Sequence, residues 1–364
     1  MNKRSLRVVM ITVNDTQNPK TGGEYVYKVI KDELIRHKYL FREVSVPILL
    51  KSVLKKDKGK IREDLYRMAL HFLCIPYSLF ERLGSNVVIT SSHPAFPVFG
   101  HLVYHQPKTG TGAQVGKEYI SILRRVGWWF VEKEWLSPVW LLAKRSHLVH
   151  LSNSNFTRRL IKELYGLDSL VLYPPVPIAP YLRKGLKNER KYAVLIAKPE
   201  VPSGIVLLPK IVKNIPKVVK FYVIGKADFT GLKIIQNLRK KGFNIEYLGY
   251  VSEQEKIKLM QTCSHYLHLG LNETFGITVV EAMAAGCVPI APNSGGMPEY
   301  LPKDLLYNDA NEAAEKIVNK IAINDFDFKL KLREIARNFS EEKFRTRFMG
   351  YFKMLENLLK IGEI

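Results

Sequence analysis

The sequence predicts an α/β fold of two domains, each built on a parallel sheet covered by helices. Three observations predict it. A chain of 364 residues exceeds what one ordinary hydrophobic core organises. In both halves, short β-rich runs alternate with amphipathic stretches, which is typical of parallel strands joined by helices. Between the halves, Tyr173–Pro180 holds four prolines in eight residues and should contain no regular element, so we place the linker there.

The first half supplies the first predicted sheet. Its predicted strands are Arg7–Val13, Asn86–Thr90, His101–Tyr104 and His147–Leu151. Its predicted helices are Gly23–Arg36 and Asn153–Leu164. Residues 51–82 and 114–145 read as longer helical insertions rich in aromatic side chains.

The second half repeats the pattern. Its predicted strands are Tyr192–Ala197, Lys220–Ile224, Asn244–Leu248, Ser264–Leu269 and Val288–Ala291. After Asp309 the chain reads as wholly helical, and the last amphipathic helix should run over Glu341–Leu359. The expected organisation is therefore a first domain over residues 1–173, a linker over 174–190, a second domain over 191–340 and a terminal helix within 341–364.

The charge balance is strongly basic. Fifty-six Lys and Arg residues against 34 Asp and Glu residues give a net charge of +22, which calls for an anionic partner. The densest cationic cluster is Lys51–Arg62, and the second insertion carries the aromatic run Arg124–Phe130. Cations beside aromatic side chains favour a surface that settles on anionic lipid. A solvated charged face beside an ordinary core is the alternative.

Cysteines and apolar runs indicate the compartment. Cys74, Cys263 and Cys287 have no metal-like spacing and no evident disulfide partner, so reduced cysteines of a cytoplasmic protein are expected. The first apolar run is too short for a signal peptide and reads as a strand. No run approaches the roughly 18–20 apolar residues of a spanning helix. We therefore expect a cytoplasmic protein, peripheral on the cytoplasmic membrane face.

The pair Glu273 and Glu281 is the most informative feature of the chain. Glu273 should lie in a loop just ahead of a helix that ends at Gly286, and Glu281 one turn inside that helix. A helix N-terminus also offers backbone amides to an anion. Carboxylates for sugar hydroxyls beside amides for a phosphate suit a nucleotide-sugar site. Capping and dipole complementation are the ordinary alternative for either carboxylate.

The context of this pair carries a family resemblance. The run His268–Pro302 contains Phe275-Gly276 after the first Glu, Glu-Ala-Met-Ala-Ala-Gly at the second, and Ser294-Gly-Gly-Met-Pro-Glu299 further on. It resembles the signature of GT-B glycosyltransferases of family 4. The resemblance implies the GT-B fold: two Rossmann-like domains that face each other across a cleft, with a C-terminal helix that crosses back to the N-terminal domain.

The resemblance also implies roles for residues of the first half. Gly22 and Gly23 follow the first predicted strand and are similar to the glycine loop that approaches the donor phosphates, although paired glycines often mark only a turn. His105 ends a predicted strand and is similar to the histidine that faces the transferred sugar. A structural histidine is the alternative, and His93 and His101 compete for the role.

In the second half the resemblance implies the remaining donor contacts. Lys198 takes the place where the family sets an Arg at the diphosphate, whereas Ser203 stands where a second cation is expected. Val251 resembles the position that meets the nucleotide base. The amides of Phe275, Gly276 and Ile277 should meet phosphate and sugar, Glu273 the sugar hydroxyls and Glu281 the ribose.

These expectations define a function. We expect a retaining glycosyltransferase that uses a GDP- or UDP-linked hexose, needs no metal and no cofactor, and serves a lipid-linked or membrane-proximal glycan. Asp325-Phe-Asp327 reads as a solvated interhelical turn, so it is not taken as a metal motif. Short segments such as Ser152–Thr157 and Val171–Val176 favour mannose, because they resemble mannosyltransferases that extend lipid-linked oligosaccharides. A non-catalytic sugar-nucleotide binder and a basic nucleic-acid-binding protein are the alternatives.

Overall fold

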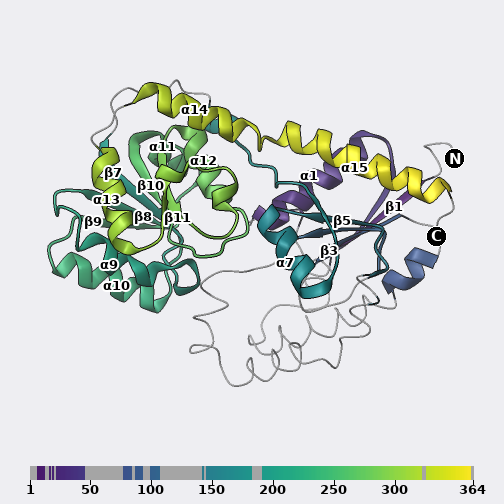
Figure 1. Ribbon diagram of the computed structural model, residues 1–364, viewed down its shortest axis with the longest axis horizontal. Coiled ribbons are helices and arrows are strands. Elements are labelled where there is room, and N and C mark those ends of the chain that lie inside the picture. Colours follow the sequence, from purple (N-terminus) through teal and green to yellow (C-terminus); the bar gives the residue numbers. More distant parts are fainter. Residues whose placement is uncertain are drawn as a thin grey trace, which may run out of the picture. The chain divides into compact units, whose positions relative to one another are not determined.

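The computed structural model divides the chain into two compact units (Figure 1). The structure describes residues 6–12, 16–17, 19, 22–45, 77–83, 87–92, 99–106, 142, 145–182, 191–321 and 325–361. Among these, the residues before 176 and the C-terminal helix Glu341–Ile361 form the first unit, and Val176–Ser340 form the second.

The first unit is built on a six-stranded parallel sheet with the order β2-β1-β3-β4-β5-β6. The strands are β1 Arg7–Thr12, β2 Leu40–Ser45, β3 Val87–Ser92, β4 Leu102–His105, β5 Val149–Ser152 and β6 Leu170–Val171. The labelled helices of this unit are α1 Gly22–Arg36, α7 Asn155–Tyr165 and α15 Glu341–Ile361. Local chemistry sets the ends of α7, because the Ser154 side chain caps its first turn and Gly166 ends it in the left-handed conformation.

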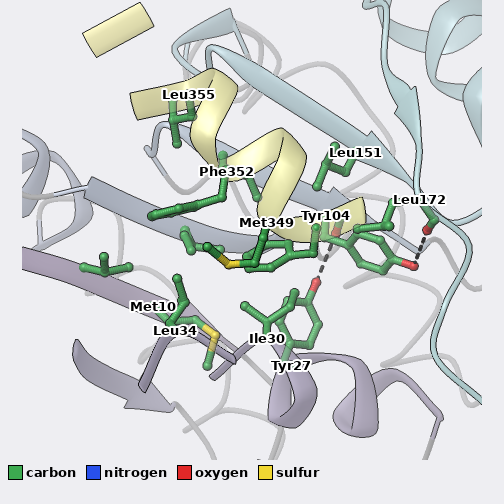
Figure 2. Close-up of a cluster of buried hydrophobic side chains, with 14 of the residues drawn as sticks. Met10, Tyr27, Ile30, Leu34, Tyr104, Leu151, Leu172, Met349, Phe352 and Leu355 are labelled. Atoms are coloured by element: carbon green, nitrogen blue, oxygen red, sulfur yellow. Dashed lines mark hydrogen bonds between the residues drawn. The ribbon is translucent and has the colours of Figure 1, made fainter. Parts of the chain in front are cut away.

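The core of the first unit lies between the sheet, α1 and α15 (Figure 2). From α15, five side chains enter this core: Phe344, Phe348, Met349, Phe352 and Leu355. Two buried hydroxyls are satisfied by backbone, since Tyr27 donates to the Tyr104 carbonyl at 3.0 Å and Tyr104 donates to the Leu172 carbonyl at 2.9 Å. The predicted return of the last helix to the N-terminal unit is thus confirmed.

The second unit carries another six-stranded parallel sheet, with the order β12-β11-β10-β7-β8-β9. Its strands are β7 Lys191–Ala197, β8 Lys220–Ile224, β9 Ile245–Gly249, β10 Cys263–Leu267, β11 Val288–Pro292 and β12 Leu306–Tyr307. Its α-helices are α8 Ala179–Leu182, α9 Leu208–Val212, α10 Phe229–Lys240, α11 Glu253–Thr262, α12 Ile277–Ala285, α13 Ala310–Ile321 and α14 Phe326–Arg337. Every pairing in both sheets is parallel, as the alternation of strands and helices predicts.

The structure departs from the expected elements in a few places. β2 was not predicted, because Arg42 and Glu43 interrupt its apolar pattern at the edge of the sheet. α8 begins at Ala179 inside the proline-rich segment that was expected to hold no regular element. Pro180 fits there because the first turn of a helix needs no intrahelical amide donor.

Several expectations fall on residues outside the described part. These are most of the two insertions, including Lys51–Arg62 and Arg124–Phe130, together with His93 and Cys74. Cys263 and Cys287 are buried in the second unit. Within the described ranges, no helix combines the length and the apolar character needed to cross a bilayer.

Candidate functional site

The carboxyl edge of the second sheet is made of tight turns. Backbone in the left-handed region occurs in the loops that follow five successive strands of the chain, at Lys198, Gly225, Gly249, Gly276 and Gly295, with φ values of 56°, 102°, 65°, 84° and 67°. Ligands of open α/β sheets bind at this edge, where the loops leave the strands. The predicted site residues of the second unit all lie in these loops or in the helices α11 and α12 that follow them.

The loop that carries Glu273 is held by a second loop, Ser294-Gly295-Gly296. The Gly296 amide donates to the Glu273 carbonyl at 2.9 Å, and the Asn272 amide donates to Ser294 Oγ at 3.0 Å. A Cβ atom on Gly295 would lie 2.1 Å from the Glu273 carbonyl oxygen, so only glycine permits this approach. The backbone of Glu273 is therefore fixed before any ligand arrives.

The Glu273 side chain is paired with His268. His268 Nε2 lies 2.8 Å from Glu273 Oε2, and a third of the Glu273 side chain remains exposed. Burial opposes ionisation of the carboxyl, but contact with His268 and the charge of Lys198 outweigh it and lower the pKa of Glu273 to about 2. Glu273 is consequently an acceptor-only carboxylate at neutral pH.

The N-terminus of α12 begins directly after this loop. Gly276 caps the helix with φ of 84°, and the Tyr300 hydroxyl donates to the Phe275 carbonyl at 2.6 Å. Phe275 is buried against the rings of Tyr300 and Phe339. The first amides of an α-helix have no acceptor inside it, so Gly276 and Ile277 present donors suited to an anion.

Glu281 lies one turn further along α12 and is almost fully buried. Its two carboxylate oxygens lie 3.1 and 3.2 Å from Lys256 Nζ of α11. Lys256 also pairs with Glu253 at 3.0 Å, and Tyr181 of α8 donates to Glu253 Oε1 at 2.8 Å. Burial raises the pKa of Glu281, while Lys256 and the Tyr181 hydroxyl favour its charged form. This cluster of Tyr181, Glu253, Lys256 and Glu281 is called the Lys256 cluster below.

The remaining predicted residues of the second unit occupy neighbouring loops. Lys198 is exposed directly after β7, Ser203 lies in a short 3₁₀ turn, and Val251 follows β9 with a half-buried side chain. Within the described ranges, no group of three or more His, Cys, Asp or Glu side chains is arranged to hold a metal ion. Asp325 caps α14 by accepting from the Phe328 amide at 2.9 Å, as expected of an interhelical turn.

The first unit brings its own predicted residues together. Gly22 and Gly23 open α1, and Gln106 next to His105 reaches the Gly23 carbonyl at 3.4 Å. His105 itself is fully buried at the end of β4, where its Nε2 lies 3.0 Å from His150 Nδ1 and the two rings stack. Glycine loop and strand-end histidine are thus neighbours at one edge of the first sheet.

Two functional partners were not predicted from the sequence. His268 had no assigned role, although it leaves the same strand five residues before Glu273. Lys256 likewise had no assigned role. Its spacing of three from Glu253 puts both on one face of α11, which is a signal, but the contact with α12 requires the fold.

The second unit resembles a known family. Residues 183–339 match the model described as glycosyl transferases group 1. The matched residues lie within the second unit, which is thus similar to a group 1 glycosyltransferase domain. Its loops carry Glu273 and Glu281 at the places described above, and the predicted resemblance to GT-B enzymes of family 4 is confirmed.

Curated proteins similar to this chain include several mannosyltransferases. The GDP-Man:Man(3)GlcNAc(2)-PP-Dol alpha-1,2-mannosyltransferase of Dictyostelium discoideum is 30% identical over 56% of this chain and 46% of its own length. The human alpha-1,3/1,6-mannosyltransferase ALG2 is 26% identical over 56% of this chain and 58% of its own length. The chain therefore spans about half the length of these curated relatives.

Solved glycosyltransferase structures share the fold. Sucrose-phosphate synthase from Thermosynechococcus elongatus covers 97% of this chain with a TM-score of 0.68 and 13% sequence identity, and 99% of that structure is matched. The likeness extends over both units, which confirms the predicted α/β fold with two parallel sheets, as in GT-B structures.

Proposed function

We propose that the protein is a retaining, metal-independent glycosyltransferase. It moves a hexose from a nucleoside diphosphate sugar to a hydroxyl of a lipid-linked or membrane-proximal glycan. One observation carries the proposal: two carboxylates stand at the same sheet edge, each with its own basic partner, Glu273 with His268 and Glu281 with Lys256. Such carboxylates accept hydrogen bonds from hydroxyl groups and are poorly suited to pass protons.

Each residue of the donor site has a proposed task. Glu273 accepts from the hydroxyls of the transferred sugar, and Glu281 accepts from the ribose. The amides of Phe275, Gly276 and Ile277 meet sugar and phosphate. Lys198 and Gly22 with Gly23 serve the diphosphate, Val251 serves the base, and His105 faces the sugar.

The proposed chemistry is a substitution on one face of the sugar. The bond between the anomeric carbon and the diphosphate oxygen breaks, and the acceptor oxygen bonds to the same carbon from the same side. The acceptor proton passes to the leaving diphosphate. Lys198 and the α12 amides stabilise the negative charge that develops there. The retaining outcome rests on the family resemblance.

Mannose from GDP-mannose is the proposed donor sugar. Support comes from the relatives described above, which are mannosyltransferases, and from the short segments of this sequence that resemble such enzymes. The test is a thermal-shift screen of GDP- and UDP-linked sugars, followed by transfer of the best donor to lipid-phosphate glycan acceptors. Stabilisation by GDP-mannose with transfer is the expected result, and the anomeric configuration of the product tests retention.

Other outcomes of this screen select other functions. Binding of a sugar nucleotide with neither hydrolysis nor transfer identifies a non-catalytic sugar-nucleotide protein. Salt-sensitive retention of DNA, with no stabilisation by any sugar nucleotide, identifies a nucleic-acid-binding protein.

We also propose that the first unit contacts an anionic membrane surface on the cytoplasmic side. Support comes from the net charge of +22 and from the helix at residues 77–83, where Phe80 and Leu83 are 72% and 77% exposed. Cosedimentation with vesicles tests it, using vesicles of phosphatidylcholine alone and vesicles with phosphatidylserine added. Binding only to the anionic vesicles is expected, and its weakening in Phe80→Ser with Leu83→Ser. Equal binding to both vesicles, or none, contradicts the proposal.

A further inference from the structure

The Lys256 cluster brings charged side chains against α12, a helix that is otherwise apolar over its buried part. Around Glu281, the residues of α12 from Val279 to Ala285 are all buried, and the others are Val, Ala and Met. The Lys256 side chain is 22% exposed and the Glu281 side chain 6%. The two charges thus meet where apolar side chains would pack without cost.

Such a pair gives little stability of its own. Removing two charges from water costs several kcal/mol per ion, and their attraction offsets this only with good geometry. Apolar residues of similar size are often equally stable in such places. A role in ligand binding accounts better for Lys256 and Glu281 than a role in holding the helices together.

The cluster also holds more negative than positive charge. Glu253 and Glu281 share the ammonium of Lys256, and the Tyr181 hydroxyl donates to Glu253. A carboxylate has about four acceptor positions. Lys256 approaches both oxygens of Glu281, which leaves further acceptor positions on each oxygen for outside donors.

The Lys256 cluster lies close to the proposed donor site, so hydrogen-bond donors of a bound ligand can reach it. Glu281 lies on the first turns of α12, whose N-terminus adjoins the Glu273 loop. Tyr266 of β10 senses both carboxylates, because burial and then the charges of Glu273 and Glu281 raise its pKa. The cluster therefore belongs to the same edge of the sheet as the proposed sugar-binding carboxylate.

We propose that Lys256 is a positioning residue for the donor site, one that holds the Glu281 carboxylate charged and oriented so that its remaining acceptor positions receive the ribose hydroxyls. The inference rests on the proposed function, because it assumes that the ligand is a ribonucleoside diphosphate. Lys256 acts through Glu281 and makes no contact with the base or the diphosphate.

The ribose itself is the probe that tests this. GDP and UDP, each compared with its 2′,3′-dideoxy analogue, are titrated calorimetrically into the wild-type chain and into Lys256→Met. Hydrogen bonds from hydroxyls to a held carboxylate should make the wild type prefer the ribonucleotide by about tenfold or more. In Lys256→Met this preference should fall to about twofold or less. Affinity for the dideoxy analogue should stay nearly unchanged.

Matched variants separate positioning from folding. Lys258→Met removes an exposed lysine two residues away on α11 and should keep the full ribose preference. Lys256→Arg keeps the positive charge and should restore most of it. Glu253→Gln frees Lys256 from its second carboxylate and should keep or increase it.

The remaining outcomes of this experiment decide whether the inference stands. An equal loss of affinity for ribonucleotide and dideoxy analogue in Lys256→Met means that Lys256 contacts the base or diphosphate directly. An unchanged preference in that variant means that Lys256 is only structural. If Lys256→Met does not fold, a lost preference in folded Glu253→Gln or Lys256→Arg overturns the inference, and a retained one supports it. A wild type that binds neither GDP nor UDP overturns the proposed function itself, and this result is distinct from binding both without ribose preference.

Discussion

His268 Nε2 lies 2.8 Å from Glu273 Oε2, and this contact fixes the charge of the carboxylate on which the proposed sugar site depends. His268 leaves the sheet at the end of β10, and its carbonyl accepts from the Tyr307 hydroxyl at 2.8 Å. Glu273 follows in the loop that Gly296 holds. His268, at the end of a strand, thus keeps the Glu273 carboxylate of the loop ionised.

Removal of this base should make the site sensitive to acid. With His268, the pKa of Glu273 is about 2, so stabilisation by the donor should persist from pH 7 to pH 5. In His268→Leu, burial is no longer outweighed, the pKa of Glu273 rises and donor stabilisation should fall over the same interval. Thermal shift with the donor across this range is the measurement. An acid loss of the same size in wild type and variant would contradict the assignment.

The free energy of unfolding should also depend on the Glu273–His268 pair, at lower pH. The pKa of Glu273 is lowered from 4.5, so its contribution to the free energy of unfolding is complete above about pH 4.5 and is lost as the pH falls towards 2. Glu273→Gln removes the titrating group and should flatten that part of the curve. It is also the control for His268→Leu.

Gly295 should tolerate no side chain. In Gly295→Ala the new Cβ would lie 2.1 Å from the Glu273 carbonyl oxygen, at a φ of 67°. We expect a loss of about 3 kcal/mol or more in the free energy of unfolding, together with loss of donor binding. Gly166→Ala is the matched control, since Gly166 has φ of 66° and open space around its Cβ position. It should lose only about 1–2 kcal/mol. Equal losses in urea denaturation would show that the close approach does not matter.

At Lys198, the backbone conformation should lower the stability of the fold, and the ammonium should strengthen donor binding. It adopts φ of 56°, a conformation that glycine takes without strain. Lys198→Gly and Lys198→Ala both remove the ammonium, so both should weaken donor binding by a similar factor. Lys198→Gly should be more stable than Lys198→Ala by about 1 kcal/mol. Unchanged donor affinity in both variants would show that the ammonium does not serve the diphosphate.

His101 should make the first unit sensitive to pH. Burial, with a smaller effect of Arg82, lowers the pKa of His101 from 6.5 to about 4, and its Nδ1 accepts from the Val88 amide. A lowered histidine pKa stabilises the fold above about pH 6.5, and that contribution is lost as the pH falls to about 4. Up to about 3 kcal/mol should disappear. His101→Gln should flatten this slope, whereas the exposed-site control His37→Gln should keep it.

α15 should be indispensable to the first unit. Phe348 is fully buried in the core of the first unit, so Phe348→Ala should cost about 3–5 kcal/mol in the free energy of unfolding. Met354→Ala on the same helix changes a side chain that is 38% exposed and should cost well under about 1 kcal/mol. Similar melting temperatures for both variants would contradict the observed packing.

Much of the fold could be predicted from the sequence, because buried parallel strands are continuous apolar runs. Lys220–Ile224 is predicted with the bounds that β8 has, and β7, β10 and β11 differ by a few residues. The edge strand β2 escaped prediction because the consecutive charged residues Arg42 and Glu43 point to opposite faces and break the apolar pattern on both. Its hydrogen bonds with β1 identify it only once the sheet is assembled.

The candidate site was predicted in its positions but not in its partners. The loop place of Glu273 and the helical place of Glu281 follow from local pattern, because Gly276 and Gly286 bound the helix. Lys256 is 25 residues from Glu281 in the chain, and no periodicity connects α11 to α12. Likewise, the burial of His105 against His150 depends on the parallel pairing of β4 with β5.

The place of α15 in the first core has a consequence for how the chain acquires its structure during synthesis. Core residues of β1, such as Met10, emerge from the ribosome first, but Phe348 and Phe352, which cover the same core, emerge after the whole of Val176–Ser340. The strands of the first unit are complete at Val171, but the second unit has all of its strands and helices before α15 is made. Folding should therefore run against the order of synthesis, and the nascent first unit must wait with its apolar face open until the last helix arrives.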